Sequence, residues 1–144
     1  ECPDMEEDIL HLKEKVDAGA SHLISQLFFD NNDFYNFLYR VREAGIMVPV
    51  EAGIMPVTNR KQIERMVSLC GASLPKKFVK IMHRYGDDPA AMQDAGIAYA
   101  VEQIVDLISN GVQGIHLYTM NNPLIARRIS QSVASLIRCS NRAE

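Results

Sequence analysis

The stretch His22-Leu-Ile-Ser-Gln-Leu-Phe-Phe29 determines how the rest of the sequence is interpreted. It is short, apolar and rich in β-prone residues, and turn-forming residues bound it on both sides, which favours a buried strand over a helix. The stretches from Ile46 to Ile54 and from Gly114 to Met120 have the same character. The sequence therefore predicts three buried strands.

Helical patterns precede and separate these strands, because apolar residues recur there every three or four positions. Asp4 and Glu7 predict a capping box that opens the first helix, and Asp30 to Asp33 predict a turn before the second. Between the second and third strands the chain is helical over a long stretch, with helix starts near Pro75 and Pro89. Apolar strands that alternate with helices predict an α/β fold with parallel strands and helices packed outside them.

Three strands are too few for either common parallel fold. A doubly wound domain usually has about five strands and a (β/α)8 barrel needs roughly 250 residues, whereas this chain has 144. No repeat, low-complexity tract or linker divides the sequence. We therefore expect residues 1–144 to form part of one domain. Alone, the chain should be marginally stable or self-associating, because open strand edges leave backbone groups that can pair with another chain.

Composition excludes several classes of protein. The formal net charge is -3, with Lys and Arg scattered along the chain, so no basic surface for nucleic acid is expected. No apolar run approaches the roughly 20 residues needed to cross a membrane, and the first residues lack the features of a signal peptide. No His, Cys and carboxylate spacing predicts a metal site. We expect a cytoplasmic protein that binds neither nucleic acid nor membranes.

Polar side chains at two places suggest ligand binding. Asp8, His11 and Lys15 lie at i, i+3 and i+7 of the first predicted helix, so they share one side of it. Asp8 and Lys15 are about 10 Å apart along the helix, which suits a long phosphate-bearing ligand. A solvated charged face is the ordinary alternative. Gln26 interrupts the first apolar strand, which predicts a buried amide that bonds either a ligand or a neighbouring backbone group.

His116 and Tyr118 share one face of the third predicted strand, and Asn121 follows directly beyond its end. The carboxyl ends of parallel strands are where ligands bind in such folds, although core packing is the ordinary role of these residue types. Gln62 opens the helix after the second strand and is expected to face the same mouth. The sequence contains no phosphate-binding glycine loop and no nucleophile with an evident base.

Five segments, in this order, resemble the C-terminal half of the methylenetetrahydrofolate reductases. They are Leu12-Lys-Glu-Lys-Val-Asp-Ala-Gly-Ala20, Ile24-Ser-Gln-Leu-Phe-Phe-Asp30, Gly53-Ile-Met-Pro-Val-Thr-Asn59, Asp94-Ala-Gly-Ile-Ala98 and Gly114-Ile-His-Leu-Tyr-Thr-Met-Asn121. The resemblance implies a partial (β/α)8 TIM barrel with the last three βα units plus extra helices, and with its N-terminal strands outside the chain. It also implies FAD at the barrel mouth, folate stacked on the flavin, and NADH or NADPH as the hydride donor.

The resemblance also implies which residues contact the ligands. The implied FAD contacts are Asp8, His11, Glu14, Lys15 and Tyr118, and the implied methylenetetrahydrofolate contacts are Gln26, Gln62, Met66 and Asn122. The sequence departs from the family pattern at His11, where Asn is familiar, at Met66, where some members place an aromatic residue, and at Asn122, where an Arg often meets the folate.

The acidic residues that act in the family's chemistry lie on early strands that this sequence lacks, so the resemblance implies no catalytic residue within the chain. The leading hypothesis is therefore a C-terminal fragment of a complete reductase that is inactive without the missing N-terminal half of the barrel, with a split enzyme completed by another chain as a variant. One alternative is a non-catalytic flavin- or folate-binding or regulatory module derived from such a barrel. A third hypothesis is a different barrel enzyme that binds another phosphate-bearing cofactor.

Overall fold

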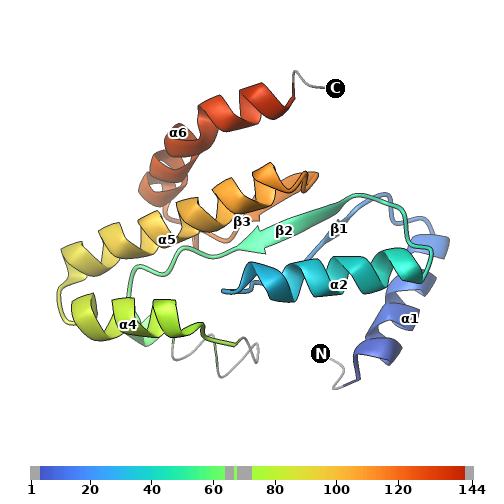
Figure 1. The fold of residues 1–144 in the computed structure, drawn as a ribbon, viewed down its shortest axis with the longest axis horizontal. Coiled ribbons are helices and arrows are strands. Elements are labelled where there is room, and N and C mark those ends of the chain that lie inside the picture. The colour runs from blue at the N-terminus through green and yellow to red at the C-terminus, as the bar shows by residue number, and fades with distance from the viewer. Residues whose placement is uncertain (1–3, 64–66, 68–72, 142–144) are drawn as a thin grey trace.

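The structure is a computed structural model that describes residues 4–63, 67 and 73–141 (Figure 1). Its elements are α1 (Met5–Asp17), β1 (Leu23–Ile24), α2 (Asn31–Glu43), β2 (Val50–Ile54), α4 (Lys76–Tyr85), α5 (Pro89–Ser109), β3 (Gly114–Leu117) and α6 (Pro123–Ser140). Residues 60–63 and 67 are also helical. The predicted α/β class is therefore confirmed.

The three strands form one parallel sheet in the order β1-β2-β3, so β2 pairs with both of its neighbours. In this register Ile24 and Gly114 flank Glu51 from opposite sides. The parallel pairing that the sequence predicted is present. Within the described residues, β1 and β3 each have one edge without a partner strand.

All three strands are shorter than predicted. The second begins at Val50 rather than at Ile46, because the Arg42 guanidinium binds the carbonyl oxygens of Ile46 and Val48, at 2.6 and 2.9 Å, and Pro49 has no N–H to donate. The first and third strands end before Phe29 and Met120, for reasons described below. Side chains and turns thus replace part of the expected backbone ladder.

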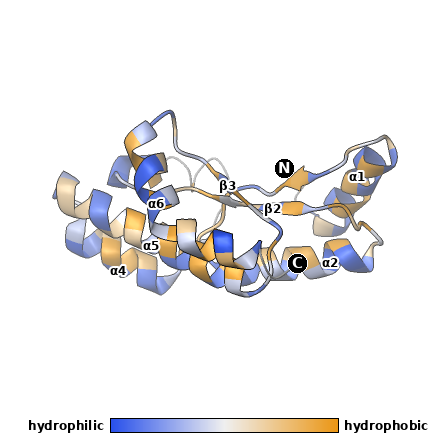
Figure 2. Cartoon of the chain, turned by 90° about the horizontal axis from the view of Figure 1, so that it is seen from above, coloured by the Kyte–Doolittle hydropathy of each residue, from blue (hydrophilic) through white to orange (hydrophobic). Residues whose placement is uncertain are grey.

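Helices cover one face of the sheet, and Figure 2 shows α2 and α5 along the same side of the strands. Val50, Ala52 and Ile54 of β2 point toward these helices and are at most 2% exposed. They form one apolar cluster with residues of α1, α2, α5 and α6. Burying Val50 or Ile54 contributes about 1.5–3 kcal/mol each. β2, which pairs with both other strands, therefore also supplies buried side chains to the core.

A second apolar cluster is built from residues that follow β1 and β2 and from the helices beside them. Its buried members are Leu27, Phe29, Met55, Val57, Ile63, Phe78 and Met92. The rings of Phe29 and Phe78 stack at 5.2 Å between centroids, which joins the extension of β1 to α4. This cluster fixes the loop after β2 against α4 and α5.

Asp30 caps α2, whose first turn begins at Asn31, and the predicted turn from Asp30 to Asp33 was therefore wrong. Its carboxylate accepts a hydrogen bond from the Asn32 N–H, so these residues form the cap and first turn of the helix. At α1, Asp4 caps as predicted, but its carboxylate accepts from the N–H of Glu6. Asp88 begins α5 in the same way, with Pro89 in the first turn.

Asp106 of α5 joins that helix to α2. Its carboxylate accepts hydrogen bonds from Asn31 Nδ2 and from the Tyr35 hydroxyl, both at 2.7 Å. These bonds, that of Asn31 first, lower the pKa of Asp106. Burial, together with the adjacent carboxylate, raises the pKa of Tyr35 to about 12, so its hydroxyl stays a donor at neutral pH.

Within the described ranges, no helix has the length and apolar character required to cross a bilayer.

Gly96 of α5 provides a test of this packing. A Cβ at this position would lie 1.7 Å from the Val57 carbonyl oxygen, in the loop after β2. We expect Gly96→Ala to lower the free energy of unfolding by about 1–3 kcal/mol, because the backbone of α5 or of the loop must move. Denaturant unfolding measures the change.

The exposed Ala98 on the same helix supplies the control. Ala98→Gly reports helix propensity alone, which favours alanine by about 1 kcal/mol. A Gly96→Ala variant more stable than the parent protein would contradict the packing described for α5.

Candidate functional site

The candidate site lies on the sheet face opposite the helices. Alternation along β2 directs Glu51 to this face, and β3 and its continuation add His116 and Tyr118. The His116 and Tyr118 rings meet edge to face with centroids 4.7 Å apart, which confirms that they share a face. Glu51 Oε2 lies 3.9 Å from His116 Nδ1, and both side chains are more than one-third exposed.

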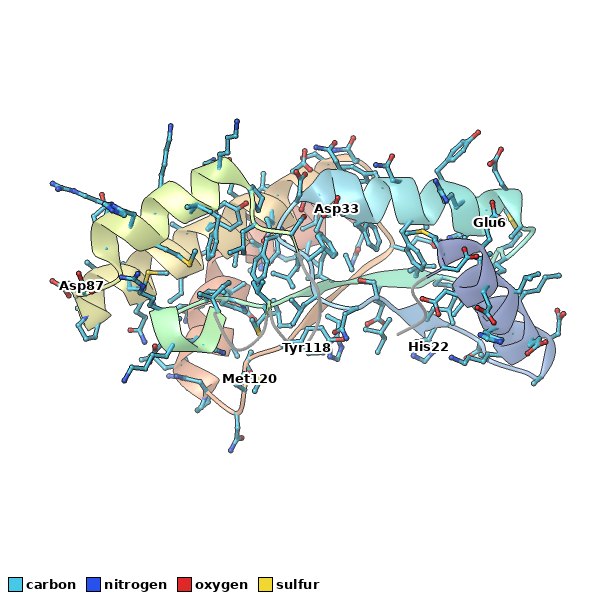
Figure 3. All side chains as sticks on the ribbon, turned by 90° about the horizontal axis from the view of Figure 1, so that it is seen from below. Glu6, His22, Asp33, Asp87, Tyr118 and Met120 are labelled. Atoms are coloured by element: carbon cyan, nitrogen blue, oxygen red, sulfur yellow. The ribbon has the colours of Figure 1, made fainter. Side chains whose placement is uncertain are left out.

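Tyr118 links β3 to the first strand across Gly53. Its hydroxyl donates to the Ser25 carbonyl oxygen at 3.1 Å, and Figure 3 shows Tyr118 near the centre of the molecule. A Cβ on Gly53 would lie 2.5 Å from that oxygen and 2.8 Å from Tyr118 Cε2. Only glycine therefore allows the ring to cross β2 this closely.

Gln26 lies on the extended segment that continues β1, and the prediction of a buried amide was wrong because this side chain is exposed. The helices cover only the opposite face of the sheet. Ile24, on the same face as Gln26, is exposed as well, at 44%. Gln26 Oε1 accepts a hydrogen bond from the Leu27 N–H at 3.1 Å. The side chain is thus accessible to a ligand on the open face.

The polar residues predicted on α1, namely Asp8, His11, Glu14 and Lys15, are all exposed. The apolar stripe of the helix, with Ile9 as its buried member, packs on the core and leaves them toward solvent. Figures 1 and 3 place α1 at one end of the molecule, away from Tyr118 and Met120. The structure therefore does not bring the α1 residues against Tyr118, and a shared ligand would have to be long.

Gln62 and Asn122 lie at helix starts. Gln62 is half-buried in the first turn after Asn59, whose side chain accepts from the Lys61 N–H at 2.8 Å. Asn122 Oδ1 caps α6 by accepting from the N–H groups of Leu124 and Ile125, at 3.1 and 3.3 Å. Asn122 thus has a structural role that the sequence reading missed.

Met66, the remaining predicted substrate contact, lies outside the described residues.

The turn that leads from β3 to α6 contains two successive non-glycine residues in the left-handed region. Met120 has φ 50° and Asn121 has φ 62°. Asn tolerates this conformation, whereas for Met it costs about 1–3 kcal/mol. This turn ends the third strand before Met120 and fixes where Asn122 begins α6.

Sequence reasoning missed Glu51 and Gly53. Both interrupt the apolar run of the second strand, and alternation alone would have placed them together on one face. Among the residues that the structure describes, no group of three or more His, Cys, Asp or Glu side chains could hold a metal ion.

Comparisons with known proteins identify the family of this chain. The methylenetetrahydrofolate reductase family model matches residues 1–134. Methylenetetrahydrofolate reductase (NADH) 1 of Arabidopsis thaliana is 36% identical over 79% of this chain and 19% of its own length. The probable methylenetetrahydrofolate reductase (NADPH) of Caenorhabditis elegans is 35% identical over 92% of this chain and 20% of its own length.

A bacterial relative is matched over a larger share of its own length. The 5,10-methylenetetrahydrofolate reductase of Pectobacterium carotovorum is 29% identical over 92% of this chain and 45% of its own length. The chain therefore spans about a fifth of the plant and animal relatives and less than half of the bacterial one. Because the family model covers nearly all of the sequence in a single match, this chain belongs to the methylenetetrahydrofolate reductase family.

Proposed function

We propose that this chain forms the last three βα units, with extra helices, of a (β/α)8 barrel that reduces 5,10-methylenetetrahydrofolate to 5-methyltetrahydrofolate. The observation that carries the proposal is the open sheet face, where the Tyr118 hydroxyl bonds the Ser25 carbonyl oxygen, next to Gln26, at the carboxyl end of the strands. In such a barrel helices cover the outer face of the strands and side chains fill the interior, so the uncovered face of this sheet would become the inner wall once the barrel closes. Ligands bind at that end of barrel strands.

FAD is the cofactor that we propose for this barrel, with NADH or NADPH as the electron donor. The residues of α1 fit such a group, because a cation and carboxylates lie exposed along one helix. The Lys15 ammonium would bind the diphosphate, and Asp8 and Glu14 would accept bonds from ribityl or ribose hydroxyls. His11 would add a further polar contact, and the Tyr118 ring would flank the flavin. Bound FAD supplies hydride transfer between nicotinamide and folate.

Gln26 is the residue that we propose for orienting the pterin of methylenetetrahydrofolate. A carboxamide both donates and accepts hydrogen bonds, which matches the alternating donors and acceptors of a pterin edge. Gln62, in the first helical turn after β2, and Met66 would contact the same substrate. Asn122 is at the mouth as well, but its Oδ1 caps α6, so we propose that only its amide nitrogen faces the folate.

The remaining strands of the barrel are the partner that this sheet lacks. β1 and β3 each leave one edge unpaired within the described residues, and open edges favour pairing with further strands. We propose that the N-terminal half of the barrel closes the sheet and supplies the acidic residues for proton transfer, so that this chain alone is inactive and self-associates. The assembled enzyme would be cytoplasmic.

Lys15 provides a test of the cofactor site in the protein completed with its N-terminal strands. We expect Lys15→Ala to weaken FAD binding by about 10- to 100-fold, because a hydrogen bond to a charged group contributes about 1.5–3 kcal/mol. The change is measured by titrating the apoprotein with FAD and following the flavin fluorescence.

Lys13 on the same helix supplies a matched control, because it forms an ion pair with Asp17 at 3.8 Å. Lys13→Ala should leave FAD affinity within about 2-fold of the parent protein, as expected for an exposed pair. Equal losses in the two variants would contradict a specific diphosphate contact. Tight FAD binding without turnover of methylenetetrahydrofolate would instead favour the non-catalytic module.

Gln26 provides the corresponding test of the substrate site. Gln26→Ala should raise the KM for methylenetetrahydrofolate by about 5- to 20-fold at unchanged FAD content, because hydrogen bonds to the pterin are lost. The exposed Gln113 lies at the opposite end of β3 and bonds Arg42 at 3.3 Å. Gln113→Ala should leave the KM unchanged, and an equal rise in both variants would argue against a pterin contact at Gln26.

A further inference from the structure

The segment that carries Gln26 is held by side chains rather than by the sheet. Ser25 N–H still donates to the Glu51 carbonyl oxygen at 3.0 Å, the last ladder bond of the first strand. Beyond it, Tyr118 binds the Ser25 carbonyl oxygen at 3.1 Å. Gln26 lies between Ser25, which Tyr118 holds, and residues 27–29. The position of Gln26 therefore depends also on the contacts that fix residues 27–29.

Two side chains of α5 fix the far end of this segment. The Tyr99 hydroxyl donates to the Phe29 carbonyl oxygen at 2.6 Å, and Gln103 Nε2 donates to the Phe28 carbonyl oxygen at 3.4 Å. Tyr99 and Gln103 are four residues apart, so they lie on the same side of the helix. Together with Tyr118, they hold the segment at both ends.

Gln103 is itself held in place by a polar network. Its side chain is only 6% exposed, and Nε2 also donates to Asn31 Oδ1 at 3.1 Å. Asn31 Nδ2 in turn donates to the Gln103 carbonyl oxygen and to Asp106. A buried amide is costly unless its bonds are made, so this network gives the carboxamide one orientation, toward the segment.

The side chains of the segment explain why the carbonyl bonds matter. Phe28 packs in the apolar cluster beneath the sheet, whereas Leu27 and Phe29 pack in the cluster at its carboxyl end. Packing therefore anchors the side chains on two sides, and the bonds from α5 set the rotation of the peptide planes between them. Burial raises the pKa of Tyr99 to about 12, with the Asp30 and Glu102 charges adding to it, so its hydroxyl remains a donor at neutral pH.

We infer that Tyr99 and Gln103 are positioning residues, which hold the Phe28 and Phe29 carbonyl groups and thereby set where Gln26 meets the substrate. The inference rests on the proposed role of Gln26 in folate binding. Neither residue reaches the open face through these bonds, so their effect on the substrate passes through the backbone of residues 26–29.

The test compares Tyr99→Phe with Tyr35→Phe in the complete flavin-loaded protein. Both changes remove one hydroxyl that joins α5 to α2 or to the segment before α2, but Tyr35 donates to the Asp106 side chain, whereas Tyr99 donates to the backbone of the segment. We measure amide hydrogen exchange of residues 25–30 and the Kd for methylenetetrahydrofolate. Tyr99→Phe should speed exchange in this segment and raise the Kd by about 3- to 10-fold, at unchanged FAD content. Tyr35→Phe should do neither.

Each other outcome overturns part of the inference. Unchanged exchange in Tyr99→Phe would show that the hydroxyl does not hold the segment, and faster exchange at an unchanged Kd would show that holding it does not position Gln26. Equal effects of both variants would indicate general loosening around α5 and would also overturn it. A parent protein that binds FAD but no folate would overturn the proposed function, whereas the exchange comparison would still decide whether Tyr99 holds the segment.

Discussion

The close crossing of Tyr118 over Gly53 is the constraint on which the open face depends. Parallel pairing joins β3 to β2, but the Tyr118 hydroxyl reaches beyond β2 to the Ser25 carbonyl oxygen of the first strand. A Cβ on Gly53 would lie closer to both groups than real contacts allow. The glycine thus lets one side chain fix the relative position of the three strand ends where ligands of parallel folds bind.

This constraint acts together with the one-sided burial of the sheet. The helix-covered face of β2 is almost completely buried, whereas the other face presents Glu51, His116 and Tyr118. The same sheet therefore provides a rigid support and an accessible polar surface. Family membership suggests the ligands that we propose for that surface. Tyr99 and Gln103 of α5 are the residues that we propose to position Gln26 for substrate binding.

Periodicity was enough to predict the α/β class, the parallel strands and the positions of the helices, because apolar spacing reports directly which faces are buried. The strand ends were wrong where side chains replaced the ladder, as Arg42 does before Val50. Gln26 was misplaced because alternation identifies a face but not whether that face is covered. The Gly53 crossing depends on residues 65 positions apart and leaves no local signal, although the resemblance had already selected Gln26 and Tyr118.

The most direct measurement is a double-mutant cycle between Gly53→Ala and Tyr118→Ala, with the free energy of unfolding as the readout. If the ring crosses the glycine as described, the new methyl group should cost less stability once the ring is gone, with a coupling energy of about 0.5–3 kcal/mol between the two changes. Strictly additive losses would show that the side chain and the glycine do not meet, and would contradict this account of the open face.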